Sequence, residues 1–430
     1  MDNMKPMKNQ TSKLTDAPEQ NNWTRARVLT LIAAFLGWMF DGVEMGIFPL
    51  IARPALLEMQ GGGRLEEGFV QLWMGIVTAC FLLGAAGGGL IFGWLGDRIG
   101  RVRAMSLSIL CYSAFTGLCY FATEPWHLAG FRFIAALGMG GEWSLGVALV
   151  MEVWPSKYRP WLAGFIGAAA NVGFVLVGLL AMVWPVSPDN WRWLMIVGAA
   201  PALLTFFIRL YVPESEAWKK AVSGKVVRPL REIFTPPILS RTILAMALAT
   251  VPLIVTWGVV QWLPLWADQL AGAGRPEVKA NVHVASAVGA ILGCILAPLL
   301  AFKIGRRPAY FVLCLMALCS CFLLFNLIDG YSVIYLLSAG LVGLFTASFY
   351  GWFPLYLPEI FPTRVRATAQ GVSFNFGRIV TAILAWNMGS IMGLFGGSYP
   401  KAGMAVSLVY VLGMIIIWFA PETNGKPLPE

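Results

Sequence analysis

Residues 152–164, EVWPSKYRPWLAG, recur in altered form as EIFPTRVRATAQG at residues 359–371, and this repeat decides the fold. Two further matches have nearly the same spacing: RIGRVRA at 98–104 with KIGRRPA at 303–309, and VPES at 212–215 with APET at 420–423. The three offsets are 207, 205 and 208 residues. The chain is therefore expected to contain two halves of the same orientation, with a site near the middle of their interface.

The composition places both halves in a membrane. Of the 430 residues 58% are hydrophobic and 12% are charged, whereas a soluble domain is about 45–50% apolar and about 25% charged. Since lipid cannot satisfy free backbone groups, apolar runs of about 20 residues predict membrane-spanning helices. We expect twelve spans, near residues 29–51, 69–92, 103–122, 126–151, 161–184, 191–211, 241–267, 282–302, 309–328, 331–353, 368–391 and 398–420. The predicted fold class is an all-α membrane protein with two pseudo-symmetric six-helix bundles.

The charges predict how the chain is oriented. Lys and Arg gather before the first span, in the central polar stretch and in every second loop, whereas the other loops contain few of them. By the positive-inside rule, both tails and the linker are cytoplasmic, in a cell membrane such as the bacterial inner membrane. The expected parts are a tail at 1–28, a bundle at 29–211, a linker at 212–240, a bundle at 241–420 and a tail at 421–430. Most of the net charge of +9 is thereby explained without nucleic acid.

The loop motifs resemble those of a transporter superfamily. GWLGDRIGRVR at 93–103, between the second and third spans, resembles the signature loop of the major facilitator superfamily. The E-x6-R pairs Glu152/Arg159 and Glu359/Arg366, and the PES and PET sequences that close the repeats, are similar to the sugar-porter-like branch. The resemblance implies transport by alternating access, by a monomer, without a cofactor or a metal. The seven cysteines show no metal-site spacing, and no nucleotide loop or nucleophile motif suggests an enzyme.

These loop charges are interpreted as a gate that holds the outward-open form. Asp97 lies where it would meet the positive end of another helix, and the Glu/Arg pairs would bridge the halves. The alternative is that they only set topology and cap helices. In the second half, Phe302 occupies the position equivalent to Asp97. The gate contact of the second half is therefore expected to be weaker or different. The predicted cytoplasmic gate consists of Asp97, Arg98, Arg101, Glu152, Arg159, Glu359 and Arg366.

Longer motifs inside the spans narrow the resemblance. RFIAALGMGGEWSLG at 132–146 and AQGVSFNFGR at 369–378 look like the lactate, sialate and related organic-acid:proton symporters. FLGWMFDGVEMG at 35–46 is similar to these and to the aromatic-acid symporters. The span near 241–267 lacks the paired-glutamine motif of sugar porters. The resemblance implies proton-coupled symport of a small organic acid anion, such as a monocarboxylate. Sugar or polyol transport, as uniport or proton symport, remains the alternative.

Acidic residues within the spans are candidates for carrying the proton. A charged side chain at the bilayer centre costs about 2.5–3.5 kcal/mol even on lenient scales, so it normally faces a cavity or a partner. Asp41 and Glu44 are three residues apart on one helix face and would raise each other's proton affinity. Glu142 is a further candidate. The alternative for Asp41 and Glu44 is a permanently ionised partner for an arginine.

Arg378 is the candidate for binding the anion, because its planar guanidinium suits a carboxylate bidentately. Asn375, three residues earlier on the same face, would add a hydrogen-bond donor. Alternatively, Arg378 is a structural counter-ion for an acid of the first half. Arg132 would steer anions or pair with an acid of the first span, and His283 is expected at an ordinary interfacial position. The other residues expected at the substrate site are Asn171, Gln261, Trp262 and Tyr350.

Overall fold

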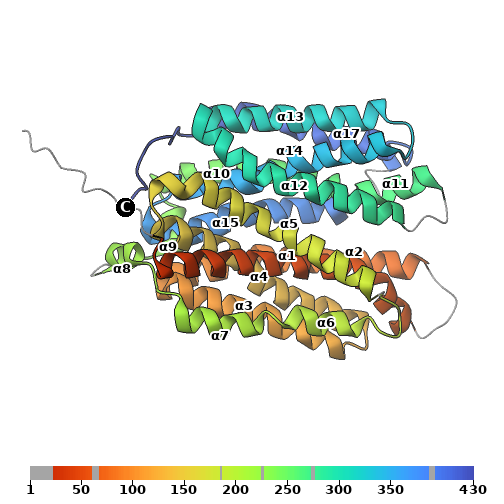
Figure 1. Ribbon diagram of the computed structural model, residues 1–430, viewed down its shortest axis with the longest axis horizontal. Coiled ribbons are helices and arrows are strands. Elements are labelled where there is room, and N and C mark those ends of the chain that lie inside the picture. The colour runs from red at the N-terminus through yellow and green to blue at the C-terminus, as the bar shows by residue number, and fades with distance from the viewer. Residues whose placement is uncertain (1–22, 61–66, 185, 224–226, 273–276, 387–392) are drawn as a thin grey trace, which may run out of the picture.

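Long apolar helices run side by side through the whole molecule (Figure 1). The computed structural model describes residues 23–60, 67–184, 186–223, 227–272, 277–386 and 393–430, and no strand occurs among them. The first-half helices are α1 (Arg25–Met59), α2 (Glu67–Ile99), α3 (Arg101–Leu118), α4 (Pro125–Val153), α5 (Arg159–Val183), α6 (Arg192–Ala199) and α7 (Ala202–Tyr211). The linker holds α8 (Glu216–Val222) and α9 (Pro229–Ile233). The second-half helices are α10 (Ile238–Gly258), α11 (Leu263–Ala271), α12 (Glu277–Ile304), α13 (Arg306–Leu327), α14 (Val333–Ile360), α15 (Arg366–Trp386), α17 (Tyr399–Ser407) and α18 (Val409–Ile416).

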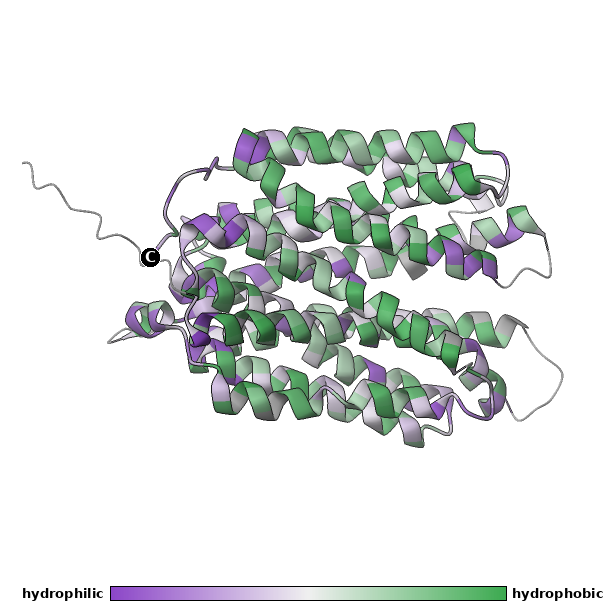
Figure 2. Ribbon diagram, viewed as in Figure 1, coloured by the Kyte–Doolittle hydropathy of each residue, from purple (hydrophilic) through white to green (hydrophobic). Residues whose placement is uncertain are grey.

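The helices have the length and surface of membrane spans. Within the described part of the chain, ten helical segments are long and apolar enough to cross a membrane. Figure 2 shows hydrophobic colouring along the helices and hydrophilic colouring concentrated at the two ends. Large apolar side chains such as Leu110, Leu296 and Leu337 are exposed on the outside, as expected where the solvent is lipid. The predicted all-α membrane fold is confirmed.

Several spans differ in detail from the prediction, and prolines explain two of the breaks. The span expected at 191–211 is divided into α6 and α7 before Pro201, which lacks a backbone N–H. The span expected at 241–267 stops at Gly258. A short 3-10 turn, Val260–Trp262, follows, and α11 then begins with Pro264 in its first turn. Residues 387–391, the last part of the span expected at 368–391, lie outside the described part of the chain.

The two most extensive contacts between the halves are those of α2 with α15 and of α5 with α12. Glycine permits close approach in the first pair. A Cβ atom added at Gly371 of α15 would lie 2.2 Å from the carbonyl oxygen of Gly89 in α2. Small residues allow helix backbones to touch in membranes. A side chain at either position would therefore separate the halves.

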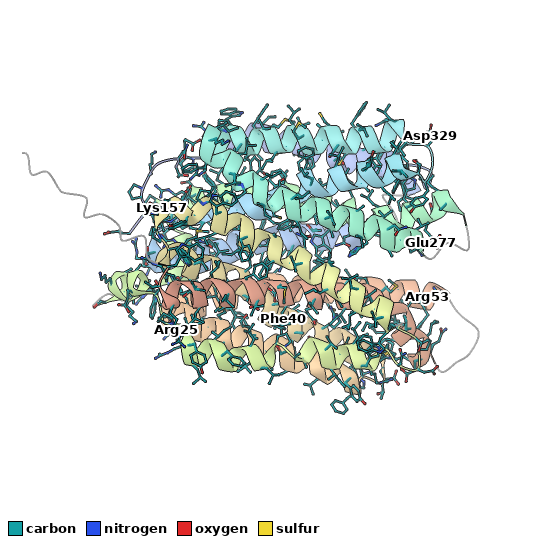
Figure 3. The ribbon with its side chains drawn as sticks, in the orientation of Figure 1. Arg25, Phe40, Arg53, Lys157, Glu277 and Asp329 are labelled. Carbon is teal, nitrogen blue, oxygen red and sulfur yellow. The ribbon has the colours of Figure 1, made fainter. Side chains whose placement is uncertain are left out.

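The molecule has two distinct ends. Arg25 and Lys157 lie at one end in Figure 3, whereas Arg53, Glu277 and Asp329 lie at the other. The connections α2–α3, α4–α5, α12–α13 and α14–α15 gather with Lys157. We call this the basic end, and the other the opposite end.

Candidate functional site

A cavity lies between the halves at the middle of the molecule. About 960 Å³ of space, including its mouth, is not filled by protein atoms. Helices α1 and α5 line one side, and α10, α11, α12, α14 and α15 line the other. Four residues expected at the substrate site line it: Asn171, Gln261, Tyr350 and Arg378. His283 lines it as well, so the expected interfacial position of that histidine is wrong.

Arg378 is a buried cation at this cavity. Only 4% of the residue is exposed, and Nη1 donates a hydrogen bond to Asn375 Oδ1 over 2.7 Å. The guanidinium lies over the ring of Phe374, 5.6 Å from its centroid. Among the described residues no carboxylate oxygen comes within 4.0 Å of it, and Nε has no hydrogen-bond partner. The site therefore presents a positive charge that the protein does not neutralise by direct contact.

Asn375 positions this arginine and does not line the cavity. Its Nδ2 donates to the carbonyl oxygens of Gly140 and Gly371, both over 2.9 Å. Both amide hydrogens are thereby used, and Oδ1 is occupied by Arg378. The expectation that Asn375 donates to the substrate is therefore wrong. The residue instead ties α15 to α4 of the other half and fixes the guanidinium.

Two acids expected to carry protons lie together beneath the cavity. The carboxyl groups of Asp41 in α1 and Glu142 in α4 are close enough to repel each other electrostatically when both are ionised. Gly37 makes room for them, since a Cβ atom there would lie 1.8 Å from Glu142 Oε1. Both residues are at most 2% exposed, and no described donor bonds to their four oxygens. Two carboxylates this close in a dry site cannot both be ionised without a large cost.

The third acid has a different partner. Glu44 Oε1 forms an ion pair of 3.1 Å with Arg132 Nη1, and both side chains are 1% exposed. The guanidinium of Arg132 also lies over the rings of Phe48 and Phe81. Neither residue of the pair lines the cavity. Arg132 therefore pairs with an acid of the first span, one of the two roles expected for it, and does not belong to the substrate site. Glu44 is correspondingly the ionised partner of an arginine, the alternative given for it.

Trp262 also departs from expectation. It lies in the 3-10 turn after α10, where adjacent side chains point in different directions. Gln261 faces the main cavity, but Trp262 lines a smaller hollow beside Trp266 and Tyr399. Trp262 is therefore not a residue of the main cavity.

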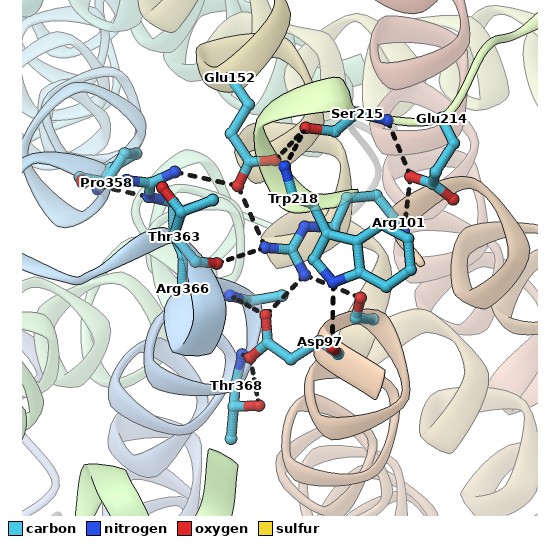
Figure 4. Close-up of polar contacts among 12 residues, drawn as sticks. Asp97, Arg101, Glu152, Glu214, Ser215, Trp218, Pro358, Thr363, Arg366 and Thr368 are labelled. Atoms are coloured by element: carbon cyan, nitrogen blue, oxygen red, sulfur yellow. Dashed lines mark hydrogen bonds and ion pairs between the residues drawn. The ribbon is translucent and has the colours of Figure 1, made fainter. Parts of the chain in front are cut away.

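At the basic end, buried charges join the two halves (Figure 4). Arg101 contacts Asp97 over 2.6 Å and Glu152 over 3.1 Å, and Arg366 contacts the same oxygen of Glu152 over 2.9 Å. All four side chains are fully buried. Arg101 also donates to the carbonyl oxygen of Thr363 in the second half. Four of the predicted gate residues thus form one network across the interface.

Asp97 additionally caps α15 of the other half. Its carboxylate accepts hydrogen bonds from the backbone N–H groups of Ala367 and Thr368, over 3.2 and 2.8 Å. The positive end of a helix favours such an anion. This is the contact with another helix that the sequence predicts for Asp97.

Two of the other predicted gate residues, Glu359 and Arg98, lie outside this network. Glu359 pairs with Arg306 of its own half over 2.7 Å, so this glutamate does not bridge the halves as predicted. Phe302, the counterpart of Asp97, is exposed. Arg98 is exposed and lies over the ring of Trp94, so it is not part of the gate. Arg159 begins α5 at the same end.

The PES and PET sequences have a structural explanation. Glu214 accepts hydrogen bonds from the backbone N–H groups of Arg101 and Val102 at the start of α3. Glu422 does the same for Arg306 and Arg307 at the start of α13. Burial raises the pKa of Glu422, but these and neighbouring backbone donors outweigh it, so the pKa lies below its ordinary value. Each half thus ends with a glutamate that caps its third span.

Comparisons with known proteins agree with this architecture. The profile of the Major Facilitator Superfamily matches residues 30–385. The cis,cis-muconate transport protein of Acinetobacter baylyi is 27% identical, over 93% of this chain and 95% of the relative. The sialic acid transporter of Escherichia coli is 27% identical, over 92% and 94%. The solved structure of the proton:xylose symporter XylE, bound to a bromodeoxyglucose, matches with a TM-score of 0.79 at 19% identity, over 94% and 98%.

Proposed function

Because the chain belongs to the Major Facilitator Superfamily of membrane transporters, we propose that it carries a small organic acid anion together with protons by alternating access. It works as a monomer in the cell membrane, with the basic end in the cytoplasm. The orientation rests on the positive-inside rule. The coupling and the substrate class rest on the cavity.

The observation that carries this proposal is the unneutralised guanidinium of Arg378. A buried charge in a membrane protein normally faces a partner or a water-filled cavity. The described protein supplies no carboxylate in contact with it, and the cavity beside it has room for a small molecule. A substrate carboxylate is the partner that completes the site. A neutral sugar gives no reason to bear the cost of this charge.

The pair Asp41–Glu142 is the proposed proton site. At least one of the two carboxyl groups holds a proton, since their mutual repulsion in a dry site opposes double ionisation. Arg378 is close enough to attract Asp41 electrostatically. An anion bound at Arg378 cancels that attraction, so it favours protonation of the pair. By linkage, a proton on the pair favours the anion equally. This reciprocity couples the binding of the proton and the anion, as symport requires.

The buried network of Asp97, Arg101, Glu152 and Arg366 is the proposed cytoplasmic gate. The cavity extends from Arg378 toward the opposite end, while this network joins the halves below it. Such an arrangement suits an outward-facing state. Because all four side chains are buried, opening the basic end requires their separation and hydration.

The names of two relatives also favour an acid. Muconate and sialic acid are both carboxylic acids, and these relatives match almost the whole chain. The likeness to XylE supports the fold alone, at 19% identity. Sugar or polyol transport is therefore retained as the alternative, and glucose and xylose belong in the test.

Replacing Arg378 tests the proposal. Arg378→Lys keeps the charge but loses the planar fork. Losing one charge-assisted hydrogen bond, worth about 1.5–3 kcal/mol, should weaken uptake about tenfold or more. Uptake of labelled muconate, sialate, benzoate and lactate is measured in proteoliposomes, with glucose and xylose for comparison. Arg98→Lys, at an exposed arginine, is the matched control. Undiminished acid uptake by Arg378→Lys contradicts capture by the guanidinium fork.

A further inference from the structure

Three aromatic rings link the cavity arginine with α1 and α4, the helices that carry the buried carboxyl pair. Trp143 of α4 stacks on Phe374 of α15, with centroids 4.2 Å apart and planes inclined by 20°. Trp143 also lies 6.3 Å from Trp38 of α1, and Arg378 lies over Phe374. Trp143 directly follows Glu142 in the sequence. The rings therefore run from the cation of the second half to α1 and α4, the helices that carry the two acids.

These rings are buried beside the cavity. Trp38, Trp143 and Phe374 are 3%, 2% and 1% exposed. Trp38 lines the cavity, whereas the carboxyl pair does not. The indole nitrogens of both tryptophans have no hydrogen-bond acceptor among the described residues. A buried region of this kind strengthens the interaction between charges on its two sides, because its effective dielectric constant is lower than that of water.

We propose that Trp38, Trp143 and Phe374 form an aromatic partition that lets an anion at Arg378 control protonation of the Asp41–Glu142 pair. This inference rests on the proposed function and adds positioning residues to it. The partition excludes cavity water from the carboxyl pair. Neutralisation of Arg378 therefore changes the electrostatic potential at the pair without being screened by water. The stacking of Trp143 on Phe374 is a favourable aromatic contact that joins the two halves.

The partition also ties coupling to conformation. Trp143 and Phe374 belong to opposite halves, so their stacking exists only while the halves are arranged as in this structure. When the halves rock apart, water reaches the pair and the proton is released to one side. The other charged or titratable groups around the pair are the bound ions Glu44 and Arg132, and Tyr112 of α3. Glu44 and Arg132 neutralise each other, so Arg378 remains the charge that a ligand can change.

Trp143→Leu tests the partition, since Trp143 does not itself line the cavity. Wild type and variant are compared in proteoliposomes with labelled muconate, sialate, benzoate and lactate as probes. One readout is exchange of labelled for unlabelled acid at equal concentrations, which needs no net proton movement. The other is accumulation driven by an imposed pH gradient. Trp161→Leu, at an exposed tryptophan of α5, is the matched control.

We expect the exchange rate of Trp143→Leu to stay within about twofold of the wild-type rate. Its accumulation of acid should fall about fivefold or more, since about fivefold is the lower end of the range for coupling between two binding sites. Trp143→Phe, which retains a stacking ring, should keep most of the accumulation. If Trp143→Leu does not fold, Trp143→Met replaces it in the same comparison.

Two outcomes overturn the partition. One is accumulation by Trp143→Leu equal to that of the Trp161→Leu control. The other is an equal loss of exchange and accumulation in a folded variant, which means a merely structural role. If acid uptake by the wild type does not depend on the pH gradient, the proposed function is refuted, whatever the result for the variant.

Discussion

One added methyl group at Gly37 tests the carboxyl pair without removing a charge. In Gly37→Ala the new Cβ would lie 1.8 Å from Glu142 Oε1 and 3.0 Å from its Cδ. To reach even 3.0 Å, the oxygen must retreat by about 1.2 Å (3.0 − 1.8). The obstacle is the end of a flexible side chain and not backbone. We therefore expect the helices to stay in place and the carboxyl group to move away from its position beside Asp41.

The expected loss is large for so small a change. A misplacement of about 1 Å in a positioned group can cost on the order of 10²-fold, so proton-driven accumulation should fall at least about tenfold. Folding should not suffer, since alanine is favoured over glycine in a helix by about 0.5–1 kcal/mol. The assay is accumulation of labelled muconate, sialate, benzoate and lactate in proteoliposomes under a pH gradient, alongside the thermal unfolding midpoint.

Gly130→Ala in α4 is the matched control, because its Cβ would meet no atom within 4 Å. Equal accumulation by Gly37→Ala and Gly130→Ala would refute the role assigned to the pair. A fall in the unfolding midpoint of Gly37→Ala alone would show that the methyl group displaces helices and not the carboxyl group.

Two further predictions concern the basic end. Glu152→Gln removes the carboxylate that Arg366 contacts. Breaking a buried ion pair costs about 3–5 kcal/mol. Because this cost destabilises the closed arrangement, the basic end should open more often. Labelling of Ala367→Cys by a maleimide should then accelerate, and an unchanged rate speaks against a gate. The pKa of Glu422 is lower in the folded state than its ordinary value of 4.5. The ionised Glu422 therefore stabilises the fold fully at a pH above 4.5, and this stabilisation is lost as the pH falls through the lowered pKa. The unfolding midpoint of Glu422→Gln should therefore depend less on pH between about 7 and 3, and parallel curves for variant and wild type contradict the cap.

The sequence predicts the fold well because the fold depends on local patterns. Apolar runs of membrane length identify the helices, and the repeats fix their common orientation. The position of Asp97 at a helix end is enough to predict that it meets the positive end of another helix, which is α15. The proline-linked breaks beside Pro201 and Pro264 also have signals in the sequence, although the predicted spans did not use them.

The pairing of buried ions is harder, since it depends on helix rotation and crossing. Asp41 and Glu44 are near neighbours on α1, yet one lies beside Glu142 and the other beside Arg132. Spacing alone cannot choose between these partners. Gln261 and Trp262 face different hollows because a 3-10 turn interrupts the helical pattern there. The stacking of Trp143 on Phe374 joins residues of different halves. No local sequence pattern can therefore predict it.

The most direct test of the account is the pH outside proteoliposomes when an acid enters. We predict that at least one of muconate, sialate, benzoate and lactate makes the outer medium more alkaline on entry through the wild-type protein. Glucose and xylose should leave it unchanged, and Asp41→Asn should abolish the signal with the acid. Alkalinisation with a sugar alone, or an unaltered acid signal in Asp41→Asn, would contradict it.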